Sequence, residues 1–114
     1  MIQSIDSVHN YFTNSNLNAK ESLAFAQYFD MYNKYDWAFE ILEPFAETSN
    51  DPELLLTYLK AGVKLNENDL SEKYLKILRY FCDNYPDLAR KWFKKDFQLA
   101  RIKKFKEIIC SLNK

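Results

Sequence analysis

The side chains that could carry out chemistry are few in this 114-residue chain, and they lie far apart. His9 is the single histidine, so a general base, a metal site or a nucleophile–base pair would each depend on it. Asp6 is its one acidic neighbour, and no cysteine lies near it. We therefore expect an exposed histidine without a catalytic role, and we expect neither a metal nor a cofactor.

Three carboxylates, Glu40, Glu43 and Glu47, recur at helical spacing. Such a run could serve as an acid pair, but intervals of three and four residues are more typical of the solvent face of an amphipathic helix. A glycine-rich phosphate loop is excluded, because the chain contains one glycine. The sequence therefore predicts a protein that is not an enzyme.

Cys82 and Cys110 are the two cysteines, and both stand inside apolar helical patterns. This placement predicts small buried hydrophobes and argues against a disulfide or a metal site. The sequence shows no signal-peptide pattern, and no apolar run approaches the roughly 18 residues of a membrane span. We expect a cytoplasmic protein with no membrane partner.

Composition predicts helices joined by short polar links. Hydrophobic residues make up 47% of the chain and aromatic residues 17%, whereas one glycine and three prolines leave little material for turns and hairpins. Pro44 stands inside an apolar helical pattern, and we expect it to kink or break that helix near Glu40 to Glu43. A chain of this length predicts a single domain over residues 1–114.

Charge is separated along the sequence although the formal net charge is zero. Residues 1–57 hold nine acidic and two basic side chains, and residues 58–114 hold seven acidic and fourteen basic ones. Such a separation could steer a partner or favour head-to-tail contact, and either effect would weaken with salt. The alternative is a solvated surface whose charges merely segregate.

The apolar pattern repeats when the chain is shifted by 36 residues against itself. The positions that coincide are Leu23 and Leu59, Ala26 and Gly62, Phe29 and Leu65, Ile41 and Ile77, Leu42 and Leu78, Phe45 and Phe81, and Asp51 and Asp87. A period of this length, built from two helical patterns, indicates an array of helical repeats that bury their apolar faces against one another.

From Asn18 to Asp87 the chain resembles the tetratricopeptide-repeat family, whose unit of about 34 residues is a helix–turn–helix with small residues at the helix crossing. Ala26 and Gly62 match the small residue of the first helix, and Ala38 matches that of the second. Other matching positions are Phe29 and Leu65 late in the first helix, and Pro52 and Pro86 at the end of the unit. The resemblance implies an all-α fold, a short right-handed superhelical stack of antiparallel helix pairs.

The expected order is a lead-in helix over residues 1–17, a first repeat over 18–50, a second repeat over 51–85 and capping helices over 86–114. Helix starts are predicted at Asn18, Asp36, Asp51 and Asp69 or Leu70. The end of the chain resembles the segment that closes many bacterial tetratricopeptide proteins, through Asp96, Phe97, Ala100, Arg101 and Phe105. This implies a capping helix, begun by Asp96, whose phenylalanines cover the last repeat.

The resemblance also implies that the first helix of each repeat lines a groove. Our candidate partner-binding residues there are two polar stripes and three tyrosines: Gln27, Asp30 and Lys34; Thr57, Lys60 and Lys64; and Tyr28, Tyr32 and Tyr58. Lys60 and Lys64, one helical turn apart, could hold a peptide carboxylate. The alternative is that these are ordinary solvated residues.

The basic stretch from Arg90 to Lys106 offers a second reading, because Trp92, Phe93 and Phe97 lie within it. Cations on phosphates and aromatics on bases could bind nucleic acid, yet helical spacing favours aromatics in the core and cations outside. The neutral overall charge also argues against a dedicated nucleic-acid binder. We therefore predict a non-catalytic protein-interaction module, a scaffold or adaptor for a peptide or protein. A nucleic-acid-associated protein is the alternative, and a homodimer through an uncovered helix face is a further possibility.

Overall fold

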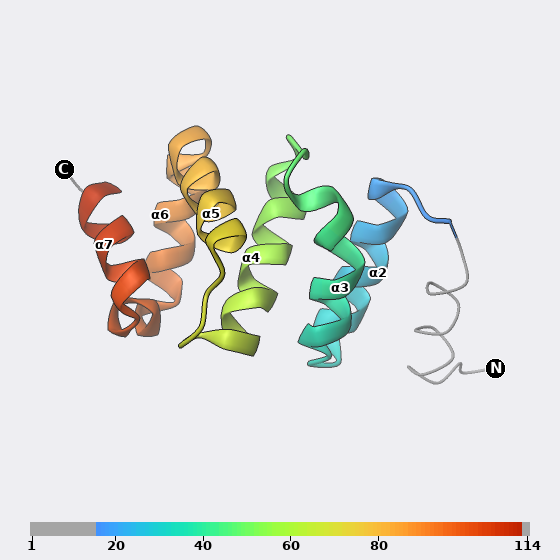
Figure 1. Ribbon diagram of the computed structural model, residues 1–114, viewed down its shortest axis with the longest axis horizontal. Helices are drawn as coiled ribbons and strands as arrows, with labels where there is room; N and C mark the ends of the chain where they lie inside the picture. Colours follow the sequence, from blue (N-terminus) through green and yellow to red (C-terminus); the bar gives the residue numbers. More distant parts are fainter. Residues whose placement is uncertain (1–15, 113–114) are drawn as a thin grey trace. The chain divides into compact units, whose positions relative to one another are not determined.

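The computed structural model describes residues 16–112, and all of their regular secondary structure is helical (Figure 1). The elements are α2 (Ala19–Met31), α3 (Tyr35–Ala46), α4 (Pro52–Asn66), α5 (Glu72–Asn84), α6 (Pro86–Lys95), the 3₁₀ helix η1 (Phe97–Arg101) and α7 (Lys103–Leu112). This confirms the all-α prediction. His9, Asp6 and nearly all of the predicted lead-in helix lie outside the described residues. Among the described helices, none combines the length and apolar character that a membrane crossing requires.

The chain forms two compact units that divide between Leu65 and Asn66. The first unit contains α2, α3 and all of α4 except its last residue; the second contains α5, α6, η1 and α7. Consecutive helices pack against each other within each unit, as α2 does with α3 and α6 with α7. The dividing line falls inside the second predicted repeat, residues 51–85.

Two predicted helix starts are confirmed in the first unit. Asn18 Oδ1 accepts a hydrogen bond from the Glu21 backbone amide at 2.8 Å, and Glu21 Oε1 accepts one from the Asn18 amide at 3.1 Å. This reciprocal capping box satisfies two amides that the first turn of α2 leaves without helical partners. Asp51 caps α4 in the same sense, since its Oδ1 accepts from the Glu53 amide at 2.9 Å and Pro52 follows as the first helical residue.

Two other predicted starts are wrong by one to three residues. Helix α3 begins at Tyr35 after Lys34, so Asp36 lies within its first turn and accepts from the Trp37 amide. Helix α5 begins at Glu72, because Ser71, and not Asp69 or Leu70, accepts from the Tyr74 amide at 3.1 Å. The predicted break at Pro44 is also absent, since α3 runs through Pro44 and ends two residues later. A proline so near the helix end removes only one of the last hydrogen bonds.

Small and aromatic residues share the core of the first unit. Ala26 on α2 and Ala38 on α3 are completely buried, so the two helices can approach closely where the sequence predicts a crossing. Phe29 is also completely buried, and its ring meets that of Trp37 edge to face at 5.6 Å between centroids. Leu55 and Leu59 bring α4 into the same apolar interior.

The second unit packs around one phenylalanine of α7. Phe105 is completely buried, and its ring lies edge to face with Trp92 at 5.6 Å and with Phe93 at 6.1 Å. The predicted single helix from Asp96 is wrong: Ile102 is extended and separates η1 from α7. Because the extended residue interrupts the helix, Phe97 and Phe105 do not share one helical face. Phe97 therefore does not join Phe105 in the core and is 71% exposed. Cys82 is buried as predicted, but Cys110 is exposed, which corrects the prediction for that thiol.

Candidate functional site

The two predicted polar stripes both lie in the first unit, on α2, its following turn and α4. Gln27 Nε2 donates a hydrogen bond of 2.7 Å to Glu53 Oε1, which joins the middle of α2 to the first turn of α4. Thr57 Oγ1 donates to the backbone oxygen of Glu53 at 2.8 Å. We call this surface the α2–α4 face; its partly or fully exposed polar residues are Gln27, Asp30, Lys34, Thr57, Lys60 and Lys64.

Two lysines of this face contact aromatic rings of the first turn of α3. Lys34 Nζ lies 5.2 Å from the centre of the Trp37 ring, and Lys64 Nζ lies 4.4 Å from the centre of the Tyr35 ring. Each ring face attracts its ammonium group and restricts where that group can move. We call Lys34 and Lys64 the lysine pair.

Hydrogen bonds hold the Tyr35 ring in place beneath Lys64. Lys64 Nζ donates to the Tyr35 hydroxyl at 3.2 Å, and that hydroxyl donates to Asn33 Oδ1 at 2.7 Å. Asn33 has φ of 60°, the left-handed conformation in which asparagine is more readily found than most residues. The turn thus fixes one aromatic ring, and that ring positions a cation contributed from α4.

Exposed apolar side chains lie at the end of α2, two and three residues before Lys34 in the sequence. Met31 is 79% exposed and Tyr32 55%. The rings of Tyr28 and Tyr32 are 5.0 Å apart, so Tyr32 is braced by a neighbour one turn back. The α2–α4 face therefore combines positioned cations with an apolar edge, which is the composition of many protein-binding surfaces.

Tyr58 does not belong to this surface, contrary to the sequence prediction, because it is 1% exposed. Its hydroxyl donates to Glu43 Oε2 at 2.8 Å, and Glu43 is consequently half-buried and not on the solvent face predicted for it. Burial, followed by the hydrogen bond and negative charge of Glu43, raises the pKa of Tyr58 well above its usual range.

Sequence reasoning missed Tyr35, Trp37 and Glu53 as residues that shape the site. The Lys34–Trp37 contact had a local signal, since residues three apart on a helix are neighbours. Tyr35 and Lys64 lie far apart in the sequence, as do Gln27 and Glu53. Only the packing of α4 against α2 and α3 brings these pairs together.

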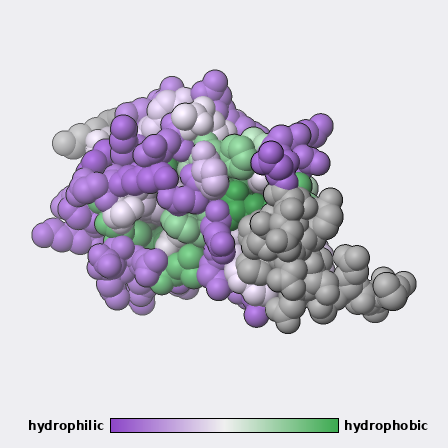
Figure 2. All heavy atoms as spheres, turned by 45° about the vertical axis from the view of Figure 1, so that its right-hand side comes forward, coloured by the Kyte–Doolittle hydropathy of each residue, from purple (hydrophilic) through white to green (hydrophobic). Residues whose placement is uncertain are grey.

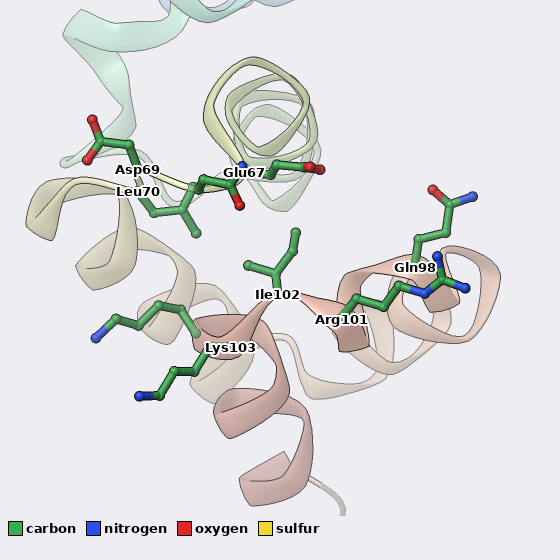
Figure 3. A pocket seen from close by; sticks show the side chains of 9 residues that line it. Glu67, Asp69, Leu70, Gln98, Arg101, Ile102 and Lys103 are labelled. Atoms are coloured by element: carbon green, nitrogen blue, oxygen red, sulfur yellow. The ribbon is translucent and has the colours of Figure 1, made fainter.

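A separate hollow of about 630 Å³ lies in the second unit, between residues 67–70 and the η1–α7 segment (Figure 3). Leu70 and Ile102 point toward one another at its centre, whereas Asp69 and Lys103 point away from it. Its charged side chains are all exposed, in contrast to the desolvated groups typical of catalytic sites. Within residues 16–112, no three metal-binding side chains gather into a possible ligand set.

The basic stretch predicted as an alternative interface has mostly buried aromatics. Trp92 and Phe93 are core residues, as helical spacing predicts, and this removes two of the three rings that could stack on bases. Phe97 remains outside among exposed cations. Figure 2 shows, on one face of the molecule, hydrophobic side chains that reach the surface among hydrophilic ones.

Comparison of the chain with protein-family models, curated proteins and solved structures gave no significant match.

Proposed function

We propose that this chain is a non-catalytic protein-interaction module, a scaffold or adaptor, whose α2–α4 face binds a peptide or protein segment. The observation that carries the proposal is the lysine pair, two cations held over aromatic rings. The exposed Met31 and Tyr32, just before Lys34 in the sequence, add apolar surface at the end of α2. The segment that fits this surface carries a carboxylate next to an apolar side chain.

Positioned ammonium groups suit this task because less side-chain entropy is lost when a ligand binds. An unrestrained lysine loses rotamer freedom on contact, at a cost of about 0.5–1.5 kcal/mol per immobilised side chain. A lysine already held over a ring has given up part of that freedom before the partner arrives. Each lysine ammonium group has three N–H donors, and Lys64 gives one of them to the Tyr35 hydroxyl, so further donors can bind a carboxylate.

We also propose that the fold is tetratricopeptide-like, a right-handed stack of antiparallel helix pairs with a cap formed by the helices after residue 85. Complete burial of Ala26 and Ala38 supports this assignment, because the family places small residues at these crossings. Packing between consecutive helices is compatible with a helical repeat. Both cysteines are free thiols, which suits a reducing compartment such as the cytoplasm.

Selection from a phage-displayed random peptide library, with the full chain as bait, tests the proposed function. We expect enriched peptides that share an acidic residue next to an aliphatic or aromatic one. One enriched peptide is then synthesised and its dissociation constant measured by fluorescence anisotropy. The Lys34→Glu/Lys64→Glu variant should bind it at least about tenfold more weakly, a loss of about 1.4 kcal/mol.

The matched control is Lys76→Glu/Lys103→Glu, which changes the net charge equally at exposed positions of the second unit. It should bind the peptide as the parent does. Failure to enrich any acidic–apolar peptide, or equal binding by the Lys34→Glu/Lys64→Glu variant, would overturn the proposal.

A further inference from the structure

Helix α3 carries an exposed face of acidic residues around a single apolar one. Asp36, Glu40, Pro44 and Glu47 follow at intervals of four, four and three, so they share one side of the helix, and all four are exposed. The helix contains no lysine or arginine. We call these four residues the acidic face.

Pro44 is an unusual residue for this position. Proline inside a helix removes a hydrogen bond and crowds the preceding turn, and here its ring does not contribute to the buried core. A rigid apolar ring between two carboxylates is a compact element that a shallow apolar hollow with a basic rim could receive.

The second unit offers such a hollow between α6, η1 and α7, with a volume of about 380 Å³. We call it the basic groove; its lining residues are Arg90, Phe93, Lys94, Phe97, Ala100, Ile109 and Leu112. Arg90 is anchored, because its guanidinium donates to Asp87 Oδ1 at 3.2 Å and to the Leu112 backbone oxygen at 3.3 Å. Lys91 and Lys95 add exposed positive charge on the same helix.

The charges of the two units are opposite and equal. Up to Leu65 the sequence has nine acidic and four basic residues, and from Asn66 onward it has seven acidic and twelve basic ones. Every copy of the chain therefore carries both a negative surface and a positive one, so the complementary partner is always present at the same concentration. Opposite potentials accelerate encounter and fix orientation.

We propose that copies of this chain associate head to tail, with the acidic face of one copy docked on the basic groove of the next. Pro44 lies against Phe97 and the apolar floor, while Glu40 and Glu47 face Lys94 and its neighbouring cations. A contact between two different surfaces either closes into a ring or continues as a chain of copies. This association goes beyond the proposed peptide binding, because neither docking surface includes the lysine pair.

Sedimentation velocity of the full chain over a range of concentrations tests this association. At low ionic strength we expect the mean mass to rise with concentration. At high salt it should return toward that of a single chain, since exposed charges are screened over a few ångströms. A mass that stays at one chain at every concentration and low salt would overturn the proposal.

Charge reversal gives the sharper test. Glu40→Lys/Glu47→Lys gives the acidic face an excess of positive charge, and Lys91→Glu/Lys94→Glu cancels the positive charge that Arg90 and Lys95 leave at the groove, so each variant alone should associate at least about tenfold more weakly. An equimolar mixture should regain association, because the unchanged acidic face of the groove variant then meets the unchanged basic groove of the other variant. Circular dichroism of each variant first establishes that it is folded.

The control Lys76→Glu/Lys103→Glu has the same charge change as the groove variant but lies outside the groove, and it should associate like the parent. Phe97→Ser should weaken association without changing charge. A mixture of the two charge-reversal variants that fails to associate would overturn the proposal. So would a chain that remains single yet binds a labelled oligonucleotide through Lys91 and Lys94, because the groove would then be a nucleic-acid surface.

Discussion

The Tyr58 hydroxyl donates a 2.8 Å hydrogen bond to Glu43 Oε2 and thereby joins α4 to α3. The same tyrosine ring stacks on Phe39 of α3, with centroids 4.5 Å apart and planes inclined by 17°. One side chain thus provides both a polar and an aromatic contact between the two helices. Its hydrogen bond also accounts for a carboxylate in a half-buried position, since a buried polar group needs a partner.

Tyr58→Phe should lower the free energy of unfolding by about 1–2 kcal/mol, because it keeps the stacked ring and removes the donor to a half-buried carboxylate. Urea unfolding followed by circular dichroism measures the change. Glu43→Gln is the matched variant: it retains an acceptor oxygen and should cost less than Tyr58→Phe. Equal stability of Tyr58→Phe and the parent would show that the hydrogen bond contributes nothing.

Cys82 should make the protein less stable as the solution becomes alkaline. Burial, with a smaller contribution from Asp83, raises the pKa of its thiol from 9.0 to about 12. Below pH 9.0 the thiol is protonated in both the folded and the unfolded protein, and its contribution to stability is fully present. Above pH 9.0 the thiol of the unfolded chain loses its proton first, so the free energy of unfolding falls as the pH rises toward the folded-state pKa of about 12.

Urea unfolding between about pH 8 and pH 10 measures this slope, to which Tyr58 adds a smaller contribution near pH 10, where its phenol begins to lose the proton in the unfolded chain. Cys82→Ala should flatten the profile, although the lost sulfur lowers stability at every pH. Cys110→Ala, at an exposed position, should leave the slope as it is in the parent. If Cys82→Ala and the parent lost stability in parallel, burial of the thiol would not be the cause.

Local signals in the sequence predicted part of this fold. The Asn18–Glu21 box and the Asp51–Pro52 start depend on residues two or three apart, and both occur where predicted. The predicted start of α5 was wrong because several residues that can cap a helix, Asp69 and Ser71 among them, stand close together in the sequence. Only the packed chain decides between such neighbours.

The candidate site depended on contacts that no local pattern encodes. Glu43 shares the helical spacing of Glu40 and Glu47, yet its tyrosine partner comes from the next helix. The two polar stripes were predicted, but the aromatic rings that hold Lys64 and Lys34 were not. Periodicity says which side of a helix is polar, whereas tertiary packing says which polar side chain meets which ring.

Asn18→Ala should destabilise the first unit by about 1 kcal/mol, because the first turn of α2 loses a side-chain acceptor. Asn18→Ser restores a capping oxygen and should recover most of that loss. Thermal unfolding monitored by circular dichroism compares the three proteins. An alanine variant that melts with the parent would mean that water satisfies the Glu21 amide as well as the asparagine does.

The sequence predicts that Phe97 and Phe105 both cover the core, but truncation to alanine should destabilise the protein strongly only at Phe105. Phe105→Ala removes the ring on which Trp92 and Phe93 pack edge to face. Truncation of a buried phenylalanine to alanine lowers the free energy of unfolding by about 3–5 kcal/mol. Phe97→Ala removes a side chain that is 71% exposed and should change the free energy of unfolding by less than about 0.5 kcal/mol. Urea unfolding monitored by tryptophan fluorescence reports on Trp92 directly. A Phe97 variant as unstable as the Phe105 variant would mean that η1 and α7 form the continuous capping helix predicted from the sequence, with both rings covering the core.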